Sequence, residues 1–294
     1  EYKHISNPQF SPQGTSELPK NESNTLYPTL VNNYADARKI NQATQVLSSF
    51  LTGGRDFEKI ESARMLNESE YVVNKQLGYI SLKTQLQPDD ILAVAFEYTA
   101  GGQVYQVGEF SSDNSSNTTN CLYLKLLKGS NMSPSMPFWD LMMKNIYSLG
   151  AYSVQKEKFR MDILYQSDTT GTAVNYISEG NIKNQILLQV MNLDRLNSQN
   201  EAHSDGFFDF VEGYTVMADM GKIIFPVVEP FGSHLRKKIG NNAIADKYVY
   251  QELYDSTLTY ARQIAEKNKF VLRGEYKASS SAEIQLESTN VARG

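Results

Sequence analysis

The feature that most constrains this fold is that apolar alternation with a period of two breaks off within a few residues wherever it occurs. Such brief alternation is typical of short strands, whereas the strands of a transmembrane barrel need about ten residues. The alternating run at 270–276 comes nearest to that length and still falls short. Segments with the apolar spacing of helices lie between the alternating runs. This mixed order predicts an α+β fold of mostly antiparallel strands with several packed helices.

Local patterns place the expected elements along the chain. Gly101 and Gly102 predict a hairpin between the runs at 91–98 and 104–110. A second hairpin is expected at 270–286, with serines 279–281 as its turn. Helices are expected at 35–51, 56–65, 136–148 and 248–265. Further strands are expected at 77–82, 121–127, 159–165, 186–190, 214–216 and 223–228.

The N-terminal segment differs in composition from the rest of the chain. Residues 1–28 are rich in Asn, Ser and Pro, which predicts an extended arm or linker. Prolines punctuate this segment at positions 8, 12, 19 and 28. Residues 29–294 are expected to form one α+β segment, with candidate sub-boundaries near 111–120 or 150. The chain begins with Glu1 and lacks a basic-then-apolar signal segment, so we interpret it as a mature chain or a piece of a longer protein.

Composition excludes several classes of protein. The formal net charge is −5, from 28 basic and 33 acidic residues, whereas a nucleic-acid groove needs a basic excess. We therefore expect no nucleic-acid partner. A single cysteine, Cys121, excludes an internal disulfide, and its apolar neighbours indicate inert packing. No stretch reaches the roughly 18 apolar residues of a membrane-spanning helix.

Residues that commonly carry catalysis are scattered along the chain. His4, His203 and His234 lie far apart in the sequence, and a structural role is expected for each. The chain has no nucleophile elbow, no phosphate-binding loop and no dinucleotide-binding glycine motif. We therefore predict no catalytic residue and no cofactor, and assign no metal ligand.

The segment 194–209 leaves one metal hypothesis open. Its Asp and Asn residues surround Gly206, and clustered oxygens of this kind can bind Ca²⁺. However, the spacing fits no EF-hand, and Asp-Gly turns form without a metal. The aromatic residues beside this glycine either form an exposed docking patch or pack the loop onto the core. They are Phe207, Phe208, Phe210 and Tyr214.

Two further features have two interpretations each. The run Arg236-Lys237-Lys238 either contacts an anionic lipid or glycan or forms a solvated basic face. Asn-x-Ser/Thr triplets begin at Asn67, Asn114 and Asn117, and they matter only in a host that glycosylates asparagine. Neither feature by itself indicates a function.

Several blocks resemble one protein family when they are taken together and in order. They are LGYISL at 77–82, LAVAFEY at 92–98, VYQVGEF at 104–110, WDLMMKN at 139–145, NLDRLNSQN at 192–200, DGFFDFVEGY at 205–214, EPFG at 229–232 and ELYDS at 252–256. This series resembles the SprA/Sov family of Bacteroidota, the outer-membrane translocon of the type IX secretion system. The similar blocks run in family order from about residue 25 to the end of the chain.

The resemblance implies a chain several times longer, which forms a very large transmembrane β-barrel with soluble insertions in the outer membrane. It also implies export of folded cargo with C-terminal signals, and gliding motility in species that glide. The implied partners are other segments of the same barrel, a cargo-shuttle barrel protein, a periplasmic plug protein and the secreted cargo. No catalytic residue or cofactor comes with the family. We expect this piece to be a non-enzymatic, soluble segment that caps or lines the pore on the extracellular or periplasmic side.

Two other classes of protein stay open on the sequence. A cell-surface glycan-binding or adhesin module is suggested by 18 tyrosines and by Trp139, because aromatic faces stack on sugars. However, Trp139 stands at a predicted helix start beside Leu141 and Met142, and a tryptophan in such a position more often packs into the core. A hydrolase that uses carboxylates is suggested only by abundant acidic residues such as Asp205, Asp209 and Glu212.

Overall fold

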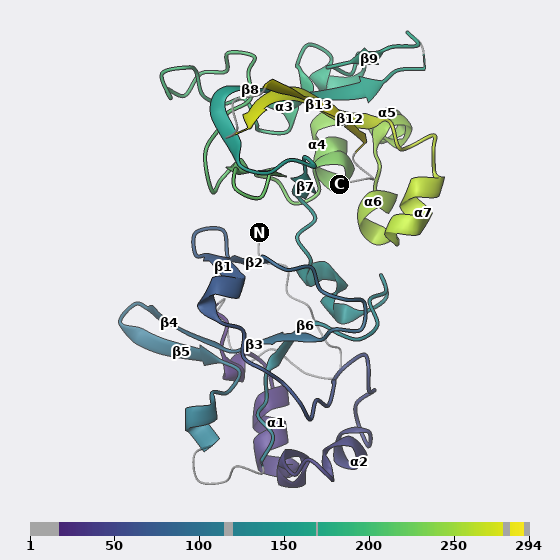
Figure 1. The fold of residues 1–294 in the computed structure, drawn as a ribbon. Coiled ribbons are helices and arrows are strands. Elements are labelled where there is room, and N and C mark those ends of the chain that lie inside the picture. Colours follow the sequence, from purple (N-terminus) through teal and green to yellow (C-terminus); the bar gives the residue numbers. More distant parts are fainter. Residues whose placement is uncertain (1–17, 115–119, 169, 279–282, 291–294) are drawn as a thin grey trace. The chain divides into compact units, whose positions relative to one another are not determined.

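The computed structural model describes residues 18–114, 120–168, 170–278 and 283–290 (Figure 1). The chain divides into two compact units, Glu1–Met142 (unit 1) and Met143–Gly294 (unit 2). The division falls close to the candidate sub-boundary near 150 and away from 111–120. Each unit mixes helices with antiparallel sheets, as expected from the sequence.

Unit 1 contains short elements only. Its helical segments are η1 (Asn21–Ser23), α1 (Leu26–Asn33), η2 (Ala35–Arg38), α2 (Ala43–Leu47), η3 (Glu68–Glu70), η4 (Ser111–Asn114) and η5 (Pro137–Leu141). Its strands are β1 (Tyr71–Asn74), β2 (Tyr79–Leu82), β3 (Leu92–Val94), β4 (Phe96–Ala100), β5 (Gln103–Val107) and β6 (Lys125–Lys128). They form three two-stranded antiparallel sheets, β1–β2, β3–β6 and β4–β5.

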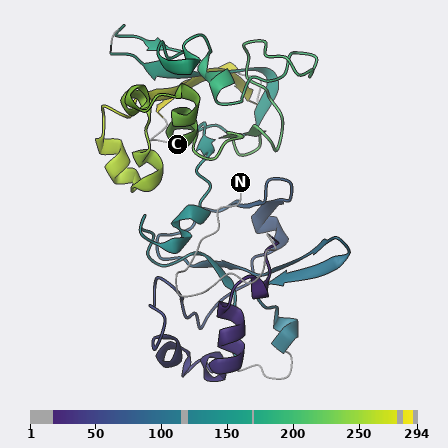
Figure 2. The same ribbon diagram turned by 180° about the vertical axis from the view of Figure 1, so that it is seen from behind.

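The predicted hairpin at Gly101 and Gly102 is confirmed. Strands β4 and β5 pair from Phe96 opposite Val107 to Ala100 opposite Gln103. Both glycines have positive φ, 59° and 77°, which a two-residue turn of type I′ requires and which glycine adopts without strain. Figures 1 and 2 show this hairpin extending outward from the rest of unit 1.

Four expectations for unit 1 need correction. Helix α1 includes Pro28, so the described part of the predicted arm is not wholly extended; proline fits a first helical turn, where its missing N–H costs no hydrogen bond.

The helix expected at 35–51 splits into η2 and α2. No helix forms at 56–65, because the Asp56 carboxylate instead accepts the Thr52 amide at 2.9 Å and closes a turn. The helix expected at 136–148 is reduced to η5. Residues 1–17 lie outside the described part.

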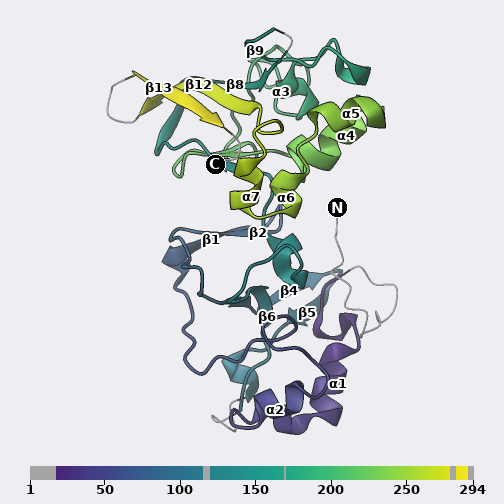
Figure 3. The same ribbon diagram turned by 90° about the vertical axis from the view of Figure 1, so that its right-hand side faces the viewer.

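Unit 2 contains the longer strands and a group of short helices. Its strands are β7 (Ile146–Ser148), β8 (Val154–Gln166), β9 (Ala173–Val174), β10 (Val216–Met217), β11 (Lys222–Ile224), β12 (Phe270–Ala278) and β13 (Glu283–Asn290). Its helical segments are η6 (Gly180–Ile182), α3 (Leu187–Val190), η7 (Pro230–His234), α4 (Leu235–Ile239), α5 (Asn242–Tyr248), α6 (Glu252–Asp255) and α7 (Leu258–Gln263). The antiparallel sheets have the strand orders β13–β12–β8–β9 and β10–β11–β7. Figures 1 and 3 show α4 to α7 gathered on one side of the larger sheet.

Strand β8, at 13 residues, is the longest element of unit 2. It pairs with β12 from Tyr165 opposite Phe270, and the register shifts between Glu275 and Lys277. Within the same stretch of β8, Lys158 has a positive φ of 61°, as expected of a bulge that bends the strand. The second predicted hairpin is confirmed by the pairing of β12 with β13, and its turn at 279–282 lies outside the described residues.

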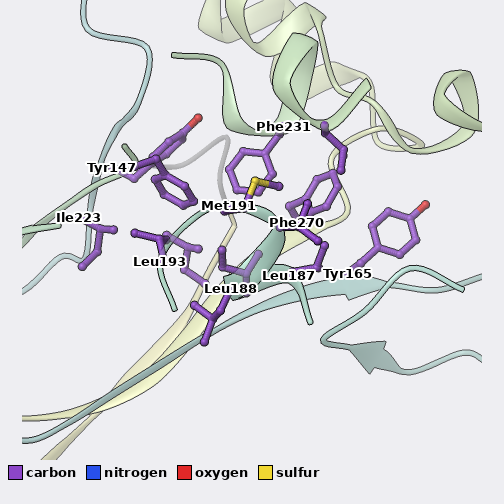
Figure 4. Packing of buried hydrophobic residues seen from close by; sticks show 14 of the residues in the cluster. Tyr147, Tyr165, Leu187, Leu188, Met191, Leu193, Ile223, Phe231 and Phe270 are labelled. Atoms are coloured by element: carbon purple, nitrogen blue, oxygen red, sulfur yellow. The ribbon is translucent and has the colours of Figure 1, made fainter. Parts of the chain in front are cut away.

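The core of unit 2 is one continuous apolar cluster. Figure 4 shows Met191 close to the rings of Phe231 and Phe270, with Leu187 and Leu188 of α3 beside them. All five side chains are at most 2% exposed. Burying a side chain of this size stabilises a fold by about 1.5 to 3 kcal/mol.

The same cluster explains the corrections in unit 2. Most of the strand expected at 186–190 is helix α3, because a short, mostly apolar run buried among other elements fits a helix as well as a strand. Residues 146–148, expected in a helix, form β7 and pair with β11. The helix expected at 248–265 breaks at Ser256, where the Thr257 side chain accepts the Tyr260 amide and caps α7. No helix in the described part of the chain has the length and apolar character to cross a bilayer.

Candidate functional site

The loop 193–213, between α3 and β10, surrounds an open pocket of about 480 Å³ in unit 2. The residues that line this loop pocket include Asn192, Arg195, His203, Asp209, Tyr214 and Thr215. The pocket therefore falls within two of the sequence blocks, 192–200 and 205–214. The loop carries no helix or strand at 193–211, so its shape depends on side-chain contacts to the backbone.

Asp194 links the start of this loop to residues 204–206 by hydrogen bonds. Its side chain is almost completely buried, and its carboxylate accepts the backbone amides of Asp205 and Gly206, each at 3.0 Å. The Gln189 amide group donates to the same carboxylate at 3.0 Å. The Ser204 hydroxyl donates to the Asp194 carbonyl oxygen at 2.8 Å. A buried carboxylate with this many donors is stable only in this backbone arrangement.

Asp209 makes a second link between the same two parts of the loop. Its carboxylate accepts the amides of Arg195 at 2.6 Å and Leu196 at 3.1 Å. Burial raises the pKa of the Asp209 carboxyl and outweighs these two hydrogen bonds, and the nearby charges of Asp194 and Asp205 raise it further. The carbonyl oxygen of Asp209 accepts a hydrogen bond from the Thr215 hydroxyl.

The calcium hypothesis treats the carboxylates of the segment 194–209 as metal ligands. In the structure these carboxylates accept hydrogen bonds from backbone amides. Asp205 accepts the Phe207 amide at 3.1 Å, and Glu212 accepts the Ala218 amide at 3.1 Å. Within the described ranges, no three or more His, Cys, Asp or Glu side chains are grouped so that they could hold a metal ion. The arrangement supports the interpretation of this segment as an Asp-Gly turn.

The aromatic run divides between core and surface. Phe208 and Phe210 pack against Phe159, with ring centroids 5.3 and 5.2 Å apart. Phe207 is 56% exposed, with the Arg160 guanidinium 5.6 Å from its ring centroid, and Tyr214 is 46% exposed. The packing interpretation therefore holds for Phe208 and Phe210, while the other two rings remain accessible.

The histidines are not brought together. His203 is exposed at the loop pocket, while the Nε2 atom of His234 lies 2.8 Å from the Val190 carbonyl oxygen. Burial lowers the pKa of His234, and the charges of Lys238 and Lys237 lower it further. His4 lies outside the described residues.

The remaining candidates lie apart from the loop pocket. Burial raises the pKa of the half-buried Cys121 thiol, which fits the expected packing role. Arg236 pairs with Asp246 at 2.8 Å, and Lys237 and Lys238 are exposed. Trp139 is half-buried in η5. Of the glycosylation triplets, Asn67 is exposed beside η3, Asn114 ends η4 and Asn117 lies outside the described residues.

A second polar cluster, around the buried Lys144, was not predicted from the sequence. Its ammonium group lies 3.5 Å from a Glu229 carboxylate oxygen and 4.0 Å from Asp255. Burial raises the pKa of Glu229, but hydrogen bonds from Ser233, Gln251 and Lys144, together with the Lys144 charge, lower it to below its usual value. The Lys144 and Glu229 side chains are only 8% and 12% exposed, whereas the Asp255 side chain is 58% exposed, so this pair is shielded from solvent and Asp255 is not.

Two tyrosines connect this cluster to the aromatic core. The hydroxyls of Tyr147 and Tyr254 lie 2.9 Å apart, and the Tyr254 hydroxyl accepts the Phe231 amide at 3.0 Å. Burial raises the pKa of both hydroxyls well above the ordinary value, so both stay protonated. The participating residues come from or beside the blocks 139–145, 229–232 and 252–256, and only the fold brings them together.

Unit 1 has its own buried carboxylate, Glu109 in the block 104–110. Arg38 donates two hydrogen bonds to it, at 2.6 and 2.9 Å, and the Tyr123 amide donates a third at 3.0 Å. Tyr27 donates its hydroxyl proton to the same carboxylate at 2.8 Å. Burial opposes ionisation, but these donors and the Arg38 charge hold the pKa of Glu109 below its usual value.

Comparison of the chain with models of known protein families and with curated proteins finds no match.

Proposed function

We propose that this chain is a non-enzymatic structural segment of the outer-membrane channel of the type IX secretion system, as its resemblance to the SprA/Sov family implies. It caps or lines the conduit, on the extracellular or the periplasmic side, and offers surfaces to other segments of the channel protein. Its further partners are the cargo-shuttle barrel protein, the periplasmic plug protein and the secreted cargo.

The observation that carries this proposal is the structural use of the blocks on which the resemblance rests. Three blocks that are distant in sequence, 139–145, 229–232 and 252–256, supply Lys144, Glu229 and Asp255 to one cluster, in which the Lys144 and Glu229 side chains are buried and Asp255 lies at the surface. Such contacts specify a fold, because the two buried charges of Lys144 and Glu229 depend on each other for their stability. A family that shares these blocks therefore shares a framework.

The loop blocks support the same proposal. Asp194, Asp205 and Asp209 each accept at least one backbone amide, so their carboxylates serve the shape of the loop. The Glu109 block in unit 1 likewise joins strand and helix segments. A catalytic site needs a general base or a nucleophile that is aimed at a substrate, and these groups are aimed at the backbone.

The parent protein and its neighbours provide the first test. An affinity tag inserted at 111–120 of the native gene would be used to purify the chain from outer membranes of the organism that encodes it. We expect the tag on a polypeptide several times longer than 294 residues, together with an outer-membrane barrel protein that shuttles cargo. A tagged chain of about 294 residues without that partner would overturn the proposal and favour the cell-surface adhesin.

Export of cargo provides the second test. Asp194→Asn in the native gene places an amide group opposite the Asp205 and Gly206 amides, so we expect the loop to loosen and cargo with C-terminal signals to accumulate inside the cell. The matched control is Asp219→Asn, whose carboxylate is exposed. Quantitative immunoblots of cell and medium fractions measure the effect. Normal export in the Asp194 variant, with proven loosening of the loop by hydrogen exchange, would contradict a role for this loop in the channel.

A further inference from the structure

We propose that the loop pocket binds a neutral saccharide. This inference goes beyond the structural role proposed above and does not depend on it. The pocket has a volume of about 480 Å³, within the range of small-ligand sites, and is open to solvent. A ligand of one or two sugar rings matches this size.

The lining presents polar groups that the fold itself does not use. Among the described residues, the side chains of Asn192, Arg195 and His203 have no hydrogen-bond partner within the protein. An amide offers both a donor and an acceptor, a guanidinium offers several donors in one plane, and an imidazole offers a ring nitrogen. Neighbouring hydroxyls of a sugar need this mixture of donors and acceptors.

The charges at the pocket favour a neutral ligand over a charged one. An anion would gain from Arg195 but would face the carboxylate of Asp209, with Asp194 and Asp205 close enough to raise the pKa of that group. A cation would gain from Asp209 but would face the Arg195 guanidinium. A hydroxyl can donate to a carboxylate and accept from a guanidinium, so it satisfies both without an unpaired charge.

An accessible aromatic ring completes the chemistry. Tyr214 lines the pocket and is 46% exposed, so one part of its ring is free to contact a ligand. Aromatic faces pack well against the C–H groups of a sugar ring, while the phenol hydroxyl stays available for a hydrogen bond. Apolar contacts from Leu196 and Val211 lie in the same pocket.

The pocket is also held in shape before any ligand arrives. Asp209 fixes the backbone at Arg195, and the Thr215 hydroxyl accepts the Val211 amide at 2.9 Å on the other side. Asp194 joins the ends of the intervening loop. A site that is ordered beforehand binds with a smaller loss of conformational entropy.

Saturation-transfer NMR on the 294-residue chain tests this proposal with three probes: methyl α-D-glucopyranoside, methyl α-D-mannopyranoside and methyl β-D-galactopyranoside. We expect at least one of them to receive saturation. Tyr214→Ala should weaken its binding about threefold to tenfold, and Tyr214→Phe should largely keep it. Arg195→Gln should also weaken it, because the guanidinium donors are lost while the backbone amide that binds Asp209 remains.

The matched control is Tyr260→Ala, which removes a ring that is 54% exposed on α7, outside the loop. Its binding should equal that of the unmodified chain. The proposal is overturned if none of the three glycosides receives saturation. It is also overturned if a glycoside binds equally well to Tyr214→Ala and Arg195→Gln, or if only sodium glucuronate, the charged counterpart, binds at this pocket.

Discussion

Units 1 and 2 are stabilised in different ways. In unit 2 one apolar cluster includes buried residues of β8, of β12 and of all the α-helices from α3 to α7. In unit 1 the described apolar cluster consists of Leu30, Ala37, Leu47 and Leu51, with partly buried neighbours. The Glu109 cluster and a pair of hydrogen bonds between Asn21 and Gly108 join the strands to this small core.

This difference determines which substitutions each unit can tolerate. An apolar cluster is not directional, so unit 2 depends on the total area that it buries and on close packing. Hydrogen bonds to a buried charge are directional, so unit 1 depends on the positions of a few donor and acceptor atoms around Glu109. The large core of unit 2 also supports the long loop 193–213, which contributes Leu193 to this cluster and packs Phe208 and Phe210 against it.

The largest effect is expected from Phe231→Ala in unit 2. The ring is fully buried, and its centroid lies 4.6 Å from that of Phe270 and 5.5 Å from that of Phe225. The cavity should lower the free energy of unfolding of unit 2 by about 3 to 5 kcal/mol. Hydrogen exchange of unit 2 amides in urea measures this change.

Trp139 supplies the control within the same molecule. It is the only tryptophan and belongs to unit 1, so its fluorescence reports the unfolding of that unit. We expect its urea midpoint to stay the same in the Phe231 variant. An equal shift of both signals would contradict separate stabilisation of the two units, because it would mean that they unfold as one.

A smaller but substantial effect is expected from Glu109→Gln in unit 1. The change leaves Arg38, whose side chain is 22% exposed, without its charge partner, at a cost of about 2 to 3 kcal/mol. Trp139 fluorescence in urea measures the shift. The matched control is Glu70→Gln, which breaks a surface pair with Arg64 and should leave the midpoint unchanged. Equal midpoints for both variants would show that the buried cluster does not stabilise unit 1.

The smallest effect is expected from pH. His234 has a folded-state pKa below its usual value of about 6.5, so its neutral form stabilises unit 2 above that pH, and this contribution is lost as the pH falls. Glu109 has a folded-state pKa below its usual value of about 4.3, so it stabilises unit 1 until the pH falls below that value. Acidification from about pH 7 to pH 5.5 should therefore remove the contribution of His234 to unit 2, while Glu109 in unit 1 keeps its charge.

Histidine variants sharpen this pH experiment. His234→Gln keeps a donor for the Val190 carbonyl oxygen but cannot be protonated, so it should reduce the loss of stability in unit 2. His203→Gln changes an exposed ring and should behave as the unmodified chain does. Hydrogen exchange for unit 2 and Trp139 fluorescence for unit 1, at both pH values, measure the outcome. An identical pH response in all three chains would rule out His234 as the cause.

The candidate site was predictable only in part. Asp194, Asp205 and Asp209 are close in sequence, and Gly206 lies among them, so their clustering could be expected. The sequence did not indicate which backbone amides would donate hydrogen bonds to their carboxylates. Nothing in the sequence indicated that Lys144, Glu229 and Tyr254 would lie close together. Long stretches of chain separate these residues, and only the folded core brings them together. The half-buried position of Trp139 likewise depends on tertiary packing.

Local sequence patterns were enough to predict the hairpins and the α+β class. Alternation and turn glycines act over a few residues, so the pairing of β4 with β5 follows from the local sequence. Tertiary packing makes 187–190 a helix, makes 146–148 a strand and interrupts the helix expected at 248–265. Short apolar segments satisfy either form locally, so the partner that buries them and completes their hydrogen bonds makes the choice.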